Sequence, residues 1–228
     1  MWKSLPGFVA AALTTSVCLG SELTAIEERW LTGAWPVVTY AREAGFPLDI
    51  VVQPQEAPGA APLALGFVDG RCKLVLTMRG NPEAQAILDR IEPDLMPVTL
   101  ELMAAHELGH CKRYLDGAWL DGPAGFAARL PDALAPELRA AYLSMMAVRR
   151  EEAYGDLVGL AWTQQRHPRQ YARLHAWLSA ERAKDRIPDS HHDTLVWVRL
   201  ARDGLAPLGP SIFARAHTLW AAGLAADD

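Results

Sequence analysis

Apolar residues follow two different periods along the chain. In the segments 48–52, 63–68 and 72–79 they recur at every second position, which is typical of strands with one buried face. Asp69-Gly70 separates the last two segments and predicts a hairpin turn. After the third segment, apolar residues recur every three or four positions, as they do on the buried face of a helix. A small sheet followed by a series of helices predicts the α+β class.

Local signals place the helices around this sheet. A helix is predicted directly after Ser21, a suitable N-cap, and another after Asn81, with Pro82 at its first position. A third begins near Pro97. Residues 116–135 hold too many Gly and Pro residues for a regular helix and predict a long loop. Further helices are expected over 136–166, 168–184, 190–203 and 210–226.

The beginning of the chain differs from the rest. It carries one positive charge at Lys3, is apolar from Leu5 to Gly20 and then turns acidic, which is the pattern of a secretory signal peptide. This stretch is too short and interrupted for a membrane span. We therefore expect residues 1–20 to be cleaved and residues 21–228 to form one periplasmic or secreted domain. The alternative is an uncleaved N-terminal segment that anchors the chain.

Composition adds two constraints. Half of the 228 residues are hydrophobic and 21% are charged, which is typical of a globular domain with a sizeable core. The formal net charge is −5 and no basic stripe is present, so nucleic acid is not expected as a partner. The sequence leaves the oligomeric state open.

The predicted export of the chain determines whether its cysteines are expected to be paired or free. Cys18 lies in the predicted leader, so the mature domain keeps only Cys72 and Cys111. Two cysteines in an oxidising compartment are expected to pair. The bond would tie the last predicted strand to the helix that begins near Pro97. Two buried thiols are the alternative.

That helix carries an HExxH motif, His106-Glu107-Leu108-Gly109-His110. Histidines four positions apart lie on one face of a helix and can offer ring nitrogens to the same metal ion. Glu107 can take a proton from a water on that metal, as zinc chemistry requires. The rest of the helix is apolar nearly all round, so these polar side chains need buried partners. The alternative is a pair of hydrogen-bonded core histidines.

A further ligand is expected on the long helix predicted after the Gly- and Pro-rich loop. Glu152 and Asp156, four positions apart, continue the apolar stripe of that helix. Two carboxylates on a core-facing stripe are costly unless a metal or a positive charge meets them. Gly155 and Gly159 beside them would let the helix approach another helix closely. The alternative partner of the carboxylates is Arg149, in an internal ion pair.

This combination of motifs resembles a known group of enzymes. HELGH followed about forty residues later by Glu-x-x-x-Asp is similar to the zincin-like (gluzincin) zinc metallopeptidases, and closest in pattern to the CAAX-prenyl endopeptidases and bacterial envelope proteases. The resemblance covers about residues 72–160 and implies a minimal zincin-like fold. It makes Glu152 the third zinc ligand beside His106 and His110. Asp156, one turn later, would orient His106.

Members of this group also carry a later histidine that donates to the oxyanion. His191 and His192, near the start of the helix predicted over 190–203, are the candidates, and Thr194 fits the pattern of the family. The chain departs from that pattern because no Pro follows the histidines and Arg199 lies too late. The choice between the two histidines stays open, as does their alternative role as capping or surface residues.

The resulting prediction is a secreted or periplasmic zinc endopeptidase that acts on peptides or proteins, without a stable membrane span in the mature chain. Glu107 would be the general base and then the proton donor to the leaving amine. The substrate is expected along the strand segment 73–79. The alternative is a catalytically silent zincin-like metal-binding domain that binds a partner in the envelope. Glu107 favours the enzyme, because zinc binding alone does not need it.

Overall fold

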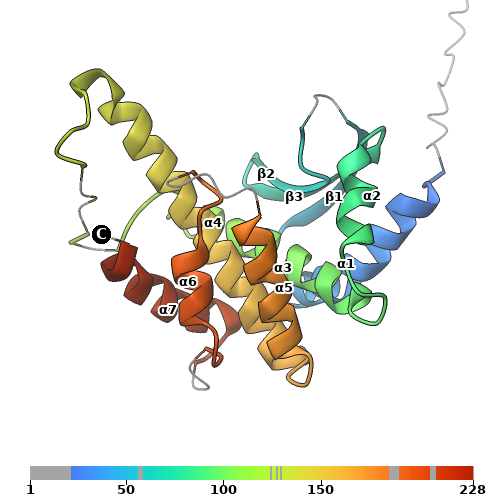
Figure 1. Cartoon of the computed structure of the whole chain (residues 1–228). Helices are drawn as coiled ribbons and strands as arrows, with labels where there is room; N and C mark the ends of the chain where they lie inside the picture. The colour runs from blue at the N-terminus through green and yellow to red at the C-terminus, as the bar shows by residue number, and fades with distance from the viewer. Residues whose placement is uncertain are drawn as a thin grey trace, which may run out of the picture.

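The computed structural model of this chain describes residues 22–55, 59–123, 125–126, 128, 130–184, 190–205 and 209–227. In this part of the chain a three-stranded sheet packs against a bundle of helices (Figure 1). The predicted α+β class is confirmed. The predicted signal peptide and Cys18 lie outside the described residues. Within them, no helix combines the length and the apolar character that a membrane crossing needs.

The elements follow the order expected from the sequence. They are α1 (Ala25–Glu43), β1 (Leu48–Pro54), β2 (Leu63–Val68), β3 (Arg71–Arg79), α2 (Pro82–Asp89), α3 (Met96–Leu115), the short 3₁₀ helix η1 (Pro136–Leu138), α4 (Arg139–Arg166), α5 (Tyr171–Ala183), α6 (Leu195–Leu200) and α7 (Ile212–Asp227). The helix α6 is much shorter than predicted.

The N-cap of α1 differs from the prediction. Thr24, not Ser21, precedes the first turn, and its hydroxyl accepts a hydrogen bond from the backbone N–H of Glu27. The Glu27 carboxylate in turn accepts from the backbone N–H of Thr24. This reciprocal capping box satisfies two N–H groups that would otherwise lack a partner. The two reciprocal hydrogen bonds of Thr24 and Glu27 cap the helix at Thr24, three residues after the serine that the sequence suggested.

The strand β3 lies in the middle of the sheet. It pairs with β1 in parallel and with β2 in antiparallel orientation. The predicted hairpin between β2 and β3 is confirmed, since Asp69 and Gly70 both have positive φ. The expectation that a substrate binds along residues 73–79 is wrong, because β3 is hydrogen-bonded on both sides. Within the described residues β1 and β2 each pair with β3 alone, so the free edges of the sheet belong to these two outer strands.

The helices α3 and α4 cross at the centre of the molecule, with the sheet on one side and α7 on the other (Figure 1). Their backbones come close because glycines lie at the crossing. A Cβ atom on Gly159 would be 2.9 Å from the carbonyl oxygen of Leu102, and one on Gly155 would be 2.8 Å from the ring of His106. The predicted close approach at these two glycines is confirmed.

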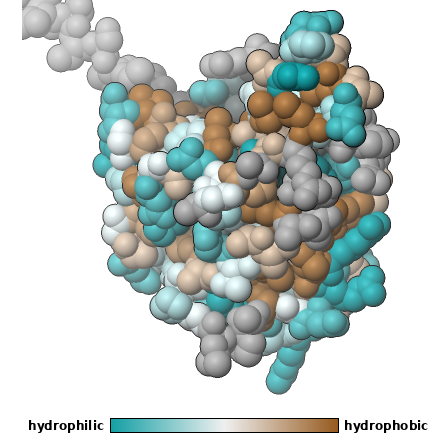
Figure 2. All heavy atoms as spheres, turned by 90° about the vertical axis from the view of Figure 1, so that its left-hand side faces the viewer, coloured by the Kyte–Doolittle hydropathy of each residue, from teal (hydrophilic) through white to brown (hydrophobic). Residues whose placement is uncertain are grey.

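Only part of α4 belongs to the core. Its first turns project from the body (Figure 1), with Leu143 more than a third exposed. Figure 2 views the molecule from this side and shows apolar side chains gathered in the upper part of that face. Buried residues begin at Met146, and every residue from Ala153 to Thr163 is buried. The buried part of α4 is therefore the part that carries Glu152 and Asp156.

A disulfide joins Cys72 of β3 to Cys111 of α3, and the Cα atoms are 5.7 Å apart. Both cysteines are fully buried. The predicted pairing is confirmed. It fixes the central strand to the motif helix one residue after His110.

Removing this bond should lower the free energy of unfolding by about 3–4 kcal/mol. The two cysteines are separated by 39 residues, so the bond restricts a long loop of the unfolded chain. Urea unfolding of the Cys72→Ala/Cys111→Ala double variant, compared with the non-reduced protein, measures the loss. Equal stability of the two proteins, or two free thiols found by mass spectrometry of the non-reduced chain, would contradict the prediction.

Candidate metal centre

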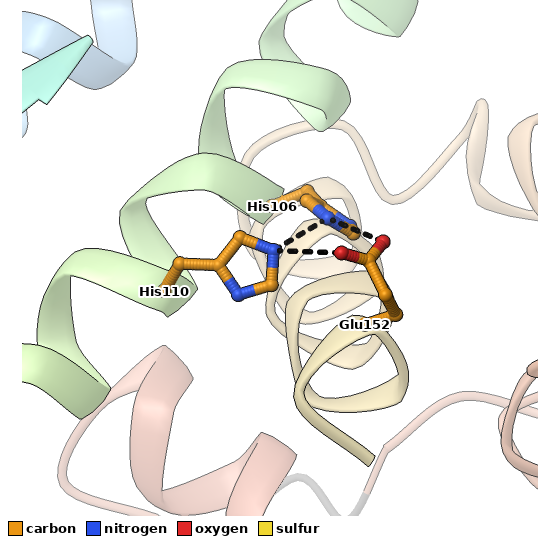
Figure 3. A group of neighbouring side chains, drawn as sticks. All are labelled: His106, His110 and Glu152. Carbon is orange, nitrogen blue, oxygen red and sulfur yellow. Dashed lines mark hydrogen bonds and ion pairs between the residues drawn. The ribbon is translucent and has the colours of Figure 1, made fainter. Parts of the chain in front are cut away.

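Three side chains from α3 and α4 converge on one point (Figure 3). Nε2 of His106 lies 2.9 Å from Nε2 of His110 and 3.5 Å from Oε2 of Glu152. Nε2 of His110 is 3.6 Å from Oε1 of Glu152. These ligand atoms all lie within 4.8 Å of one another. The group could hold a metal ion.

Two of the three spacings fit such an ion, and the third, 2.9 Å between the two Nε2 atoms, is a hydrogen-bond distance. Bonds of about 2.0–2.1 Å in a tetrahedral site place neighbouring ligand atoms about 3.4 Å apart, close to the two distances from Glu152. The two Nε2 atoms face each other, and two imidazole lone pairs repel unless a proton or a cation lies between them. Nδ1 of His106 is engaged by Asp156, which leaves its Nε2 as the ligand atom.

Asp156 is the centre of the hydrogen bonds that hold His106. Its carboxylate lies 3.0 Å from Nδ1 of His106 and accepts a bond from the hydroxyl of Thr194 at 2.6 Å. Arg182 of α5 donates to both oxygens, at 2.6 and 2.8 Å. Such a partner fixes the tautomer and the ring orientation of a metal-binding histidine. This is the geometry that the resemblance implied for Asp156.

Arg182 was missed by the sequence analysis. It pairs with Asp156 and also lies 3.7 Å from the carboxylate of Glu152. Arg149, which the sequence suggested for this role, donates its Nε–H to the carbonyl oxygen of Asp193. The sequence of α5 contains no motif that distinguishes Arg182 from the other charged residues of this helix. Only the packing of α5 against α4 reveals it.

The electrostatics of the group favour a positive charge between the ligands. Burial lowers the pKa of His106, but hydrogen bonds with Asp156 and Glu152 outweigh it and raise this pKa to about 10. Burial and the charge on His106 lower the pKa of His110 to about 3. Burial raises the pKa of Glu152, but its contacts with His106 prevail and lower it to about 2. Without a metal, a proton on His106 supplies the charge.

Glu107 lines the same cavity as the three ligand candidates. Burial raises the pKa of its carboxyl group to about 7, against the opposing effect of the charge on His106. A pKa close to the working pH suits a group that must take and return a proton. Glu107 is therefore chemically distinct from the ligand candidates, although it adjoins one of them in the sequence.

The two histidines expected near the oxyanion differ in position. Nε2 of His192 is 3.9 Å from Oε2 of Glu152, and this residue lines the cavity. Its side chain remains 59% exposed. The ring of His191 is tilted by 55° against that of His192, with ring centroids 4.1 Å apart. Of the two candidates, His192 is therefore the one directed toward the ligand group.

A cavity of about 380 Å³ opens beside the ligand group. The strand β2 lines one side through Leu63, Ala64 and Leu65, and α5 lines another through Leu178 and Arg182. A groove between a free strand edge and a helix has the shape that an extended chain requires.

Comparison with known proteins found no match: no family model, curated protein or solved structure matches the chain. The resemblance to zincin-like metallopeptidases therefore stays a prediction that rests on the motif residues. The metal-binding capacity of the group rests on its geometry.

The group should bind about one divalent metal ion per chain, and His106→Ala, His110→Ala and Glu152→Ala should each abolish this binding. Each change removes one of the three converging ligand atoms. Elemental analysis by plasma mass spectrometry of the dialysed proteins measures the metal content. His217→Ala, at an exposed histidine of α7, is the control and should keep the metal. Full metal content in Glu152→Ala would refute this ligand set.

Binding of the metal near neutral pH should release about one proton. The pKa of His106 is raised to about 10 by Asp156 and Glu152, so its imidazole is protonated before the metal enters. The competing proton is lost as the pH rises through the pKa, and metal affinity should therefore increase with pH up to that range. Titration calorimetry in two buffers of different ionisation enthalpy measures the release. The same enthalpy in both buffers would show that no proton leaves.

Proposed function

We propose that this chain is a zinc-dependent endopeptidase. The observation that carries the proposal is the convergence of His106, His110 and Glu152 in one cavity with the half-buried Glu107. Two imidazoles and one carboxylate are a donor set that suits zinc, and three protein ligands leave a fourth position free for chemistry. A site for storage or structure would close that position and would not need Glu107.

The chain's own residues can carry the proton transfers of peptide hydrolysis. Zinc in this site would acidify a water molecule and polarise the carbonyl group of the substrate. Glu107 would accept the proton from the attacking water and later return it to the leaving amine. His192, exposed at the mouth of the site, can donate a hydrogen bond to the oxygen that becomes negative.

The edge of β2 supports a peptide as the substrate. Residues 63–65 line the cavity, and within the described residues β2 pairs on one side only. An extended peptide can add to such an edge through main-chain hydrogen bonds. This assignment replaces the central strand β3, which has no free edge. The central position of β3 removes the substrate site first expected for the peptidase and favours the binding alternative, a silent domain. The edge of β2 is what supports a peptide site in its place.

The cysteines support an oxidising compartment as the location of the proposed activity. A disulfide between Cys72 and Cys111 persists in oxidising compartments and is rare in the cytosol. The predicted leader of residues 1–20 points the same way. Both features support an enzyme that acts in the periplasm or outside the cell.

Glu107→Gln should retain zinc and lose about a hundredfold or more of its peptide hydrolysis. The amide keeps the size of the side chain but cannot accept the proton. Cleavage of fluorescently labelled casein, together with the zinc content of the same samples, measures the two effects separately. Glu43→Gln, at an exposed position near the end of α1, is the matched control. Undiminished hydrolysis by Glu107→Gln would rule out this mechanism.

A further inference from the structure

A row of stacked aromatic rings leads from β2 to the ligand group. The ring centroids of Phe67 and Tyr114 are 4.9 Å apart, and those of Tyr114 and Trp119 are 4.0 Å apart. The ring of Trp119 meets that of His110 edge to face at 5.4 Å. We call Phe67, Tyr114 and Trp119 the aromatic wall. Tyr114 and Trp119 also line the cavity, so the wall borders the space where a substrate would lie.

Buried charges hold Trp119 in this position. It belongs to the turn that follows α3, and this turn is fixed by Glu151, whose carboxylate accepts the backbone N–H of Leu120 at 2.9 Å. Arg113 donates two hydrogen bonds to the same carboxylate, at 2.8 and 3.0 Å. Both charged side chains are less than a tenth exposed. Removing such an ion pair from water costs free energy. The pair therefore fixes the conformation of the turn more than it stabilises the fold.

The backbone of the turn is strained as well. Leu120 has a φ of 66°, which a residue other than glycine rarely adopts, at a cost of about 1–3 kcal/mol. Trp119 is the residue of this turn that reaches the cavity. Both the strained backbone and the buried ion pair therefore belong to the turn that positions the ring of Trp119 beside His110.

The wall gives part of the cavity lining an aromatic character. Glu152, Asp156, Arg182 and His192 supply charged and polar groups to the lining. Tyr114 and Trp119 add stacked rings to it, and the ring of Trp119 lies edge to face against that of His110. A charged side chain placed there would lose its hydration, whereas an apolar one would gain contact with the rings.

We propose that the aromatic wall is a specificity subsite, which accepts a bulky apolar or aromatic side chain next to the bond that is cleaved. This inference rests on the proposed peptidase function and identifies the class of its substrates. Trp119 is the specificity-determining residue, because it contacts both the cavity and a ligand candidate. Tyr114 stacks on the ring of Trp119 and so helps to hold it in place.

Two metal-binding probes separate the wall from the metal. Acetohydroxamic acid carries a zinc-binding group and a methyl group, and hydrocinnamoyl hydroxamic acid carries the same group and a phenyl ring. Calorimetry with the zinc-loaded chain should show that the phenyl compound binds about tenfold more tightly or better. Trp119→Ala should abolish most of this difference and leave the affinity for acetohydroxamic acid within about twofold. Trp35→Ala, at an exposed tryptophan of α1, is the matched control and should behave like the wild type.

Each outcome decides the proposal. Equal affinity of the wild type for the two probes, or an unchanged preference in Trp119→Ala, would overturn the subsite and leave the peptidase proposal intact. Failure of the zinc-loaded wild type to bind either probe would overturn the open metal site, and the subsite with it. Trp119→Phe keeps a ring at the position, and retention of the phenyl preference in this variant would support the wall even if Trp119→Ala does not fold.

Discussion

The contact between α3 and α4 at their glycines is the constraint on which the candidate centre depends. Glu152 and Asp156 lie four positions apart on α4, as do Gly155 and Gly159, and both pairs lie on the side of α4 that meets α3. The glycines on this face let the backbone of α4 reach the ring of His106. The carboxylates on either side of Gly155 then meet that ring from both of its nitrogens. A side chain larger than glycine at this crossing would separate the carboxylates from the histidines.

Local patterns in the sequence predicted most elements, the two histidines and the two misplaced carboxylates of α4, because each of these depends on residues close in the chain. The two-residue period of the strands, the Asp69-Gly70 turn and the HExxH spacing are such local patterns. The choice of Glu152 over Asp156 as the third ligand came from the family resemblance. The order of the strands was not predictable, because periodicity indicates which face is buried and not which strand is the neighbour. Arg182 and Trp119 were missed for a related reason. Each matters through a contact with a distant helix, and neither interrupts a local pattern.

The two histidines of the motif have unequal support. His106 is fixed by a carboxylate that Arg182 and Thr194 hold in place, whereas Nδ1 of His110 has no hydrogen-bond partner in the described part of the chain and its ring rests against Trp119. A hydrogen-bonded carboxylate increases the basicity of the ligand behind it. The site thus joins one strongly oriented ligand with one that is positioned by packing.

The disulfide divides the residues of the site into two groups. The segment that it closes, residues 72–111, contains both histidines of the motif and Glu107, while Glu152 lies on α4, outside that segment. A metal ion shared by the three ligands would therefore act as a second cross-link, between the closed segment and the remaining helices. Because binding to the folded state alone stabilises it, such an ion would protect the chain from degradation. For the peptidase proposed above, catalytic competence and survival would then depend on the same atom.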